Sequence, residues 1–78
     1  MTAHAIDTDL TRGQERVLAA ITAHWATEGI PPTIRELETA TGYRSTSAVH
    51  RVVRQLEQRG LISSTPGLTR SIKLVAPV

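Results

Sequence analysis

The sequence predicts a small, mainly α-helical domain that ends in a short β-hairpin. Three observations predict this fold class. Apolar residues recur at helical spacing in three successive segments, a Ser or Thr precedes each segment, and the pattern changes after Gly60 to two short strand-like runs. With 78 residues and no cysteine, the chain can form one aliphatic core without disulfide support.

The first helix is expected from Arg12 to about Thr27. Thr11 is a good N-cap, and Gln14 stands three residues later, as a capping box requires. One apolar stripe follows at helical spacing: Val17, Leu18, Ile21 and Trp25. Gly29 and the two prolines after it end the helix.

The second helix is short and begins with another capping box. Thr33 is its cap, and Glu36 is placed to reach back to the backbone of Thr33. Gly42 ends the helix, because glycine adopts a left-handed backbone at low cost. The predicted buried face consists of Ile34, Leu37 and Ala40.

The third helix is expected after Ser45, the third hydroxyl cap, and Gly60 ends it. It carries the strongest periodic signal in the chain: Val49, Val52, Val53 and Leu56. Three of these residues are β-branched and mildly disfavour a helix. We therefore expect tertiary packing to hold this segment helical.

Residues 61–65 and 70–75 are predicted to be two short strands. Pro66-Gly67 favours a type II turn, whereas two-residue hairpins use other turns, so a looser loop over about 65–69 is expected. An isolated hairpin is marginally stable. Three of its residues should therefore pack on the helices: Ile62, Ile72 and Leu74.

The order of these elements is that of a winged helix-turn-helix, three helices followed by a two-stranded wing. Residues 1–9 lack a sustained period and are predicted to form a flexible N-terminal arm, and residues 10–76 one domain. In such a domain the third helix enters the major groove of DNA. The wing would then contact the DNA backbone or the minor groove.

The charge distribution agrees with an anionic partner. The net charge is only +2, but residues 1–38 hold three basic and six acidic residues, and residues 39–78 hold six basic and one acidic. Opposite its apolar stripe the third helix presents Ser47, Arg51, Arg54 and Gln58, with no acid.

These residue types suit double-stranded DNA. Arg51 can form a bidentate bond to guanine, Ala48 permits close approach to a thymine methyl, and Arg54 suits a phosphate. Helix N-termini offer free N–H groups to phosphates. His50 either takes up a proton beside phosphates or remains an uncharged surface residue. The predicted DNA-binding residues are Thr33, Arg35, Ser45, Thr46, Ser47, Ala48, His50, Arg51, Arg54, Thr69 and Arg70.

Four segments carry a family resemblance: LTRGQERVL (10–18), GIPPTIREL (29–37), TGYRSTSAV (41–49) and LEQRGLI (56–62). On these segments, residues 10–75 resemble the N-terminal DNA-binding domain of LexA, the bacterial SOS repressor. The resemblance implies a winged helix-turn-helix that reads operator DNA. It places Ser45, Ser47, Ala48, His50 and Arg51 at base-contacting positions. His50 and Arg51 replace an acidic pair found in some members, which implies a different operator.

In the LexA family this domain is followed by a linker and a self-cleaving serine-lysine peptidase domain with the main dimer contacts. The 78 residues leave no room for these parts. We therefore expect a stand-alone domain that does not cleave itself.

The leading hypothesis is a sequence-specific transcription regulator, bound to DNA as a monomer or as a homodimer on a two-fold site. The alternative is a protein-interaction module that antagonises or modulates a full-length repressor, using the surface of the first helix. No catalytic residue, metal site or cofactor is predicted, because His4, His24 and His50 are scattered and no nucleophile motif is present. His24 is read as a half-buried edge residue. Without an apolar span or a secretory signal, the expected location is the bacterial cytoplasm or a bacterial or phage nucleoid, with no membrane partner.

Overall fold

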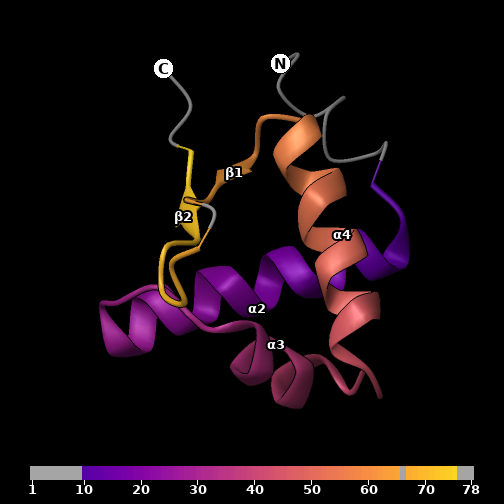
Figure 1. Cartoon of the computed structure of the whole chain (residues 1–78), viewed down its shortest axis with the longest axis horizontal. Helices are drawn as coiled ribbons and strands as arrows, with labels where there is room; N and C mark the ends of the chain where they lie inside the picture. The colour runs from indigo at the N-terminus through magenta and orange to yellow at the C-terminus, as the bar shows by residue number, and fades with distance from the viewer. Residues whose placement is uncertain (1–9, 66, 76–78) are drawn as a thin grey trace.

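A computed structural model describes residues 10–65 and 67–75. Within these ranges it contains three helices followed by a two-stranded antiparallel hairpin (Figure 1). The elements are α2 (Arg12–Glu28), α3 (Ile34–Thr41), α4 (Thr46–Gln58), β1 (Ile62–Ser63) and β2 (Lys73–Leu74). This order confirms the predicted fold class, a winged helix-turn-helix. The predicted arm, residues 1–9, lies outside the described residues.

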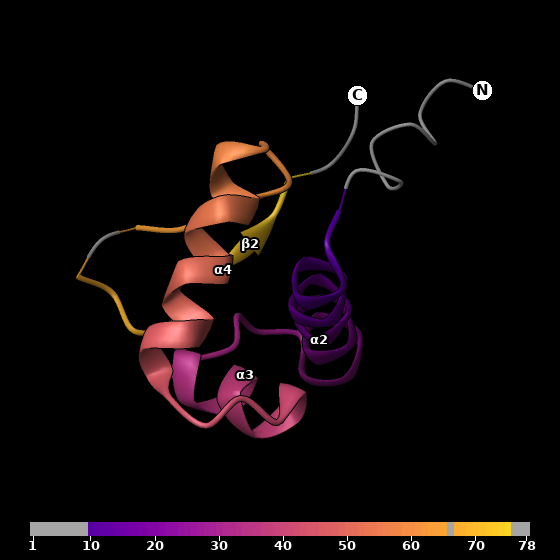
Figure 2. The same ribbon diagram turned by 90° about the vertical axis from the view of Figure 1, so that its right-hand side faces the viewer.

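The three helices pack against one another, and α4 also packs against β1. In Figure 1 α2 runs across the view and α4 runs steeply past it, and Figure 2 looks along α2 with α4 to one side. One core results, formed by Val17, Ile21, Leu37, Val49, Val52, Val53, Leu56, Ile62 and Ile72. All four residues of the predicted α4 stripe belong to it, so packing does hold this β-branched segment helical.

The helix ends form as the sequence predicts. Thr11 and Thr33 both complete capping boxes, and the Ser45 hydroxyl accepts a hydrogen bond from the Ala48 amide. After α2 and α3, Gly29 and Gly42 have φ values of 72° and 83°. These caps fix where each helix stops, and therefore how α4 is placed relative to α3.

The predicted buried face of α3 is wrong at one position. Ala40 is exposed, and Thr41 is buried in its place. Thr41 follows Leu37 by four residues and so shares its face of the helix. Its hydroxyl donates to the Leu37 carbonyl oxygen at 2.7 Å, which removes the cost of burying a polar group.

The hairpin is shorter than predicted, with two residues in each strand and a loop over residues 64–72. A turn does form at the predicted place. Gly67 has a φ of 87°, and the Leu68 amide donates to the Thr65 carbonyl oxygen. Ser71 turns inward, and its hydroxyl accepts from the Thr65 amide at 2.9 Å. This inward bond closes the loop early and cuts the pairing short.

The prediction that Leu74 packs on the helices is also wrong. Leu74 pairs with Ile62 across the hairpin, yet Ile62 is 2% exposed and Leu74 is 39% exposed. The reason is that α4 covers β1, whereas β2 is the outer strand and packs mainly on β1. The other two predicted contacts, Ile62 and Ile72, are confirmed as core residues.

Candidate nucleic-acid interface

The outward face of α4 gathers four of the sequence-predicted residues. Ser47, His50, Arg51 and Arg54 are exposed and line one shallow depression together with Gln55 and Gln58. The opposite face of the helix is buried in the core. These polar side chains are therefore the ones that α4 can offer to a ligand.

The N-terminus of α4 lies next to this depression. Ser45 and Thr46 are exposed, and Ala48 is half-buried. Ser45 accepts the Ala48 amide at 3.2 Å, so its hydroxyl is used for capping. The N-terminal end of a helix favours an anion, because its amides point outward and its dipole is positive there.

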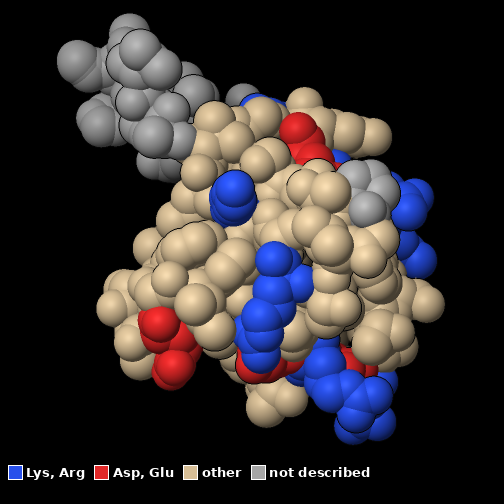
Figure 3. Space-filling view, turned by 60° about the vertical axis from the view of Figure 1, so that its left-hand side comes forward, with Lys and Arg blue, Asp and Glu red and all other residues tan. Residues whose placement is uncertain are grey.

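Few acidic groups interrupt this surface. The single acid of α4, Glu57, accepts a hydrogen bond from the Ser64 hydroxyl and so faces the hairpin loop. Figure 3 shows the side of the molecule toward the hairpin, where Lys and Arg side chains are spread from the centre to the right and lower edges, with smaller acidic areas. The outward face of α4 itself carries His50, Arg51 and Arg54 in one depression whose lining includes no acid, and it is basic and polar as its sequence predicts.

A cleft of about 260 Å³ separates α4 from the hairpin loop. His50 and Arg54 border it on the helix side, and Ser64, Thr65 and Ser71 contribute from the hairpin. The sequence does not single out these three hydroxyl residues. Their only signal is a run of small polar residues flanking Pro66-Gly67, which equally describes any loop.

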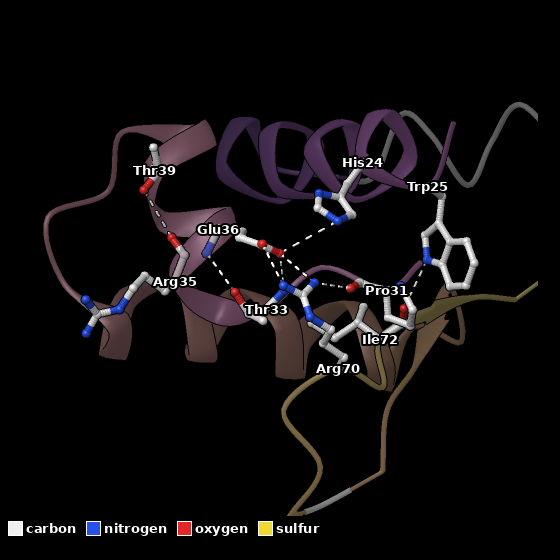
Figure 4. Close-up of polar contacts among 9 residues, drawn as sticks. All are labelled: His24, Trp25, Pro31, Thr33, Arg35, Glu36, Thr39, Arg70 and Ile72. Carbon is white, nitrogen blue, oxygen red and sulfur yellow. Dashed lines mark hydrogen bonds and ion pairs between the residues drawn. The ribbon is translucent and has the colours of Figure 1, made fainter. Parts of the chain in front are cut away.

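The predicted residues at the start of α3 divide into two environments. The Thr33 hydroxyl accepts the Glu36 amide at 3.0 Å, so it serves the capping box. Arg35 is exposed and points away from Glu36 (Figure 4). Arg35 therefore remains available to an outside anion, whereas the Thr33 side chain is already engaged.

Of the two predicted wing residues, Thr69 is exposed, whereas the side chain of Arg70 is bonded to the start of α3 and to the segment before it. Arg70 binds both carboxylate oxygens of Glu36, at 2.8 and 2.9 Å, and also donates to the Pro31 carbonyl oxygen at 2.9 Å. The structure thus brings Arg70 to the start of α3.

This pairing changes the acidity of both groups. The Arg70 hydrogen bonds, followed by the one from the Thr33 backbone amide, lower the pKa of Glu36 from its ordinary 4.5 to about 2, against the opposing effect of burial. The same pair raises the pKa of Arg70. His24 is half-buried, as predicted, and its Nε2 lies 3.6 Å from Glu36 Oε1.

Two further features bear on what kind of site this is. Within the described residues, no three His, Cys, Asp or Glu side chains stand close enough together to hold a metal ion. In residues 10–65 and 67–75, no helix combines the length and hydropathy needed to cross a bilayer.

Comparison with known proteins agrees with the geometry. Residues 7–71 match the family described as the LexA DNA binding domain. The chain is 41% identical to the LexA repressor of Caldicellulosiruptor saccharolyticus over 66 residues, which are 85% of this chain and 33% of that protein. It is 37% identical to the LexA repressor of Mycobacterium leprae over 91% of this chain and 30% of that protein. The chain spans about a third of the length of these relatives. The basic outward face of α4 agrees with a family match that covers residues 7–71, most of the chain. The chain therefore belongs to the LexA DNA-binding domain family.

Proposed function

We propose that this domain is a sequence-specific transcription regulator of the repressor class that binds double-stranded DNA. In this proposal α4 enters the major groove, and the hairpin loop lies over the backbone or the minor groove. The observation that carries it is the outward face of α4, where Ser47, His50, Arg51 and Arg54 stand together without a free acid. Its place of action would be the nucleoid.

The residues divide by the chemistry they can perform. Ser47, Ala48, His50 and Arg51 face base edges, because they lie in the first two turns of α4. Phosphate contacts come from groups at the rim, which fix the register of the protein on the duplex. The proposed rim is Thr33, Arg35, Ser45, Thr46, Arg54 and Thr69.

The test is selection of bound duplexes from a random library, followed by fluorescence anisotropy over a salt series. We expect a defined consensus, and an affinity that falls with salt at a log–log slope of about −0.9 for each phosphate contacted. Replacing Arg51 and Arg54 by Ala should abolish selection.

The matched control replaces Arg12 and Arg16, two exposed arginines on α2, by Ala. It removes the same charge from α2 rather than from the outward face of α4, and it should leave the consensus unchanged. Absence of any bound duplex at low salt and micromolar protein would refute the proposal.

The consensus also reports the assembly on DNA. Two inverted half-sites about 10 base pairs apart would indicate a homodimer on a two-fold site. A single unrepeated site would indicate a monomer.

A second candidate is a module that binds a full-length LexA repressor. The observation that favours it is an apolar depression on the outward side of α2, lined mainly by Leu10, Leu18, Ala19, Ala23 and Ala26. Co-elution with a LexA repressor in the absence of DNA would support this candidate. Elution as separate peaks, together with a selected consensus, would favour direct DNA binding.

A further inference from the structure

The hairpin loop is attached to the helices by side chains rather than by strand pairing. Each strand has two residues, too few to fix a nine-residue loop by themselves. Long-range hydrogen bonds of two side chains, Trp25 and Arg70, supply the attachment (Figure 4). Trp25 Nε1 donates to the Ile72 carbonyl oxygen at 3.0 Å, and Arg70 Nη1 donates to the Pro31 carbonyl oxygen at 2.9 Å.

Glu36 lies at the centre of the second attachment. Its Oε1 accepts the Thr33 amide at 2.9 Å and so completes the capping box of α3. The same carboxylate receives Arg70 at both oxygens. One side chain therefore holds the start of α3 and the end of the hairpin loop together.

The geometry of Arg70 argues against a phosphate as its partner. The two terminal nitrogens of its guanidinium already donate to three acceptors, in the bidentate arrangement that this group favours with a carboxylate. Glu36 also neutralises its charge. To reach DNA, Arg70 would have to give up these bonds.

We propose that Arg70 is a positioning residue, and that its pair with Glu36 sets where the hairpin loop stands relative to α4 on the DNA. The inference rests on the proposed function. It replaces the sequence-based expectation that Arg70 itself contacts the backbone or minor groove.

The pair sits where its loss would alter binding more than folding. The two side chains are 41% and 39% exposed, and ion pairs at that exposure add little to stability. The core cluster, which includes Ile62 and Ile72, contains neither of them. The loop would lose the attachment that Arg70 gives it and would keep those made by Trp25 and by Ser64.

Glu36→Gln tests whether Arg70 contacts a phosphate directly or positions the loop, because the two roles predict opposite changes in DNA affinity. It removes a negative charge from a DNA-binding protein and releases Arg70, so a direct phosphate contact by Arg70 would make binding tighter. A positioning role makes binding several-fold weaker, because the loop loses its tether. Affinity is measured by fluorescence anisotropy on the duplex selected by the native protein.

The control is Glu38→Gln, the same charge change two residues away on α3. Glu38 is half-buried and, unlike Glu36, takes part in neither of the ion pairs found among the described residues. We expect it to bind DNA as the native protein does or slightly more tightly. Circular dichroism melting shows whether each variant is folded.

Arg70→Lys supplies a second, independent variant, since Gln at position 36 also affects the α3 cap. Lys keeps the charge that a phosphate contact needs but cannot form the bidentate bond. Positioning predicts weaker binding with shifted amide signals for Leu68 and Thr69 in NMR spectra of the free protein. A direct contact predicts nearly native binding.

Exchange of the two residues completes the test. The double variant Glu36→Arg/Arg70→Glu should bind DNA better than either single variant, although position 70 is then acidic. If Glu36→Gln and Arg70→Lys bind as tightly as the native protein, the positioning role is overturned while DNA binding stands. If the native protein binds no duplex, the proposed function itself fails.

Discussion

Arg51 and Arg54 both project from α4, but their surroundings differ. Arg51 lines only the outer depression, whereas Arg54 also borders the cleft between α4 and the hairpin loop. In the proposed complex, this difference favours base edges as the partner of Arg51 and the phosphate backbone beneath the wing as the partner of Arg54.

Arg51→Ala is expected to lower affinity for the selected duplex by ~1–3 kcal/mol and to relax sequence preference at one position. Arg54→Ala is expected to weaken binding to all duplexes alike and to reduce the salt slope by about 1. Anisotropy on the selected and a scrambled duplex distinguishes them. Equal losses on both duplexes from both variants would contradict this division.

Gly13 offers a second residue-level prediction, inside α2. Replacing a helical Gly by Ala normally stabilises by up to about 1 kcal/mol. At Gly13, however, a Cβ atom would lie 2.5 Å from the Tyr43 hydroxyl, so one of the two must move.

Gly13→Ala alone is therefore expected to give none of that gain, or to destabilise. In a Tyr43→Phe background, which removes the hydroxyl oxygen, the same substitution should stabilise. Urea unfolding of the four proteins in this double-mutant cycle measures the coupling. Additive effects would show that the contact is without consequence.

At the scale of elements, the hairpin is asymmetric. β1 belongs to the core through Ile62, and β2 contributes an exposed Leu74 opposite it. The strand that α4 covers contributes to the core, and the outer strand follows the loop that holds Thr69, which the proposed function uses.

Ile62→Ala is expected to destabilise the domain by about 2–5 kcal/mol, because it leaves a cavity between α4 and β1. Leu74→Ala, its cross-strand partner, is expected to change stability by less than about 1 kcal/mol. Chemical unfolding of both variants tests the difference. Similar losses would mean that β2 is covered to the same degree as β1.

At the scale of the whole molecule, Glu36 links α2, α3 and the hairpin through its contacts with His24, Thr33 and Arg70. Its pKa is about 2 in the folded protein against an ordinary 4.5. The folded state thus binds fewer protons at this group than the unfolded state between these values.

The stability contributed by Glu36 is therefore present above about pH 4.5 and lost as the pH falls toward 2. Because the pair is exposed, we expect only a small difference in unfolding free energy between native protein and Glu36→Gln at neutral pH, and we expect that difference to vanish in acid. The unfolding free energy of the Glu38→Gln control should change with pH as that of the native protein does between about pH 4.5 and pH 2. A constant gap between native and Glu36→Gln down to pH 2 would contradict the linkage.

Several features of the whole fold follow from local sequence. The caps at Thr11, Thr33 and Ser45 and the α4 stripe are read from neighbouring residues, because helix capping and helical periodicity act over three or four positions. The candidate residues of α4 follow from the same periodicity, since the face opposite the stripe must be exposed.

Other features depend on contacts between distant segments. Burial of Thr41 rather than Ala40, and exposure of Leu74, depend on which side of each element another one covers. Gln14 and Gln55 join α2 to α4 by a side-chain hydrogen bond at 2.9 Å across 41 positions. Neither the residue types nor their spacing in the sequence predicts such a pair.

By itself, then, the sequence determined the order and ends of the helices, the existence of a hairpin and the polar face of α4. Only the tertiary structure decided that Arg70, one of the predicted DNA-binding residues, pairs with Glu36, 34 positions away. The physical reason is one of range. Capping and periodicity are written in adjacent residues, whereas the partner of a long charged side chain depends on which segment the folded core brings within its reach.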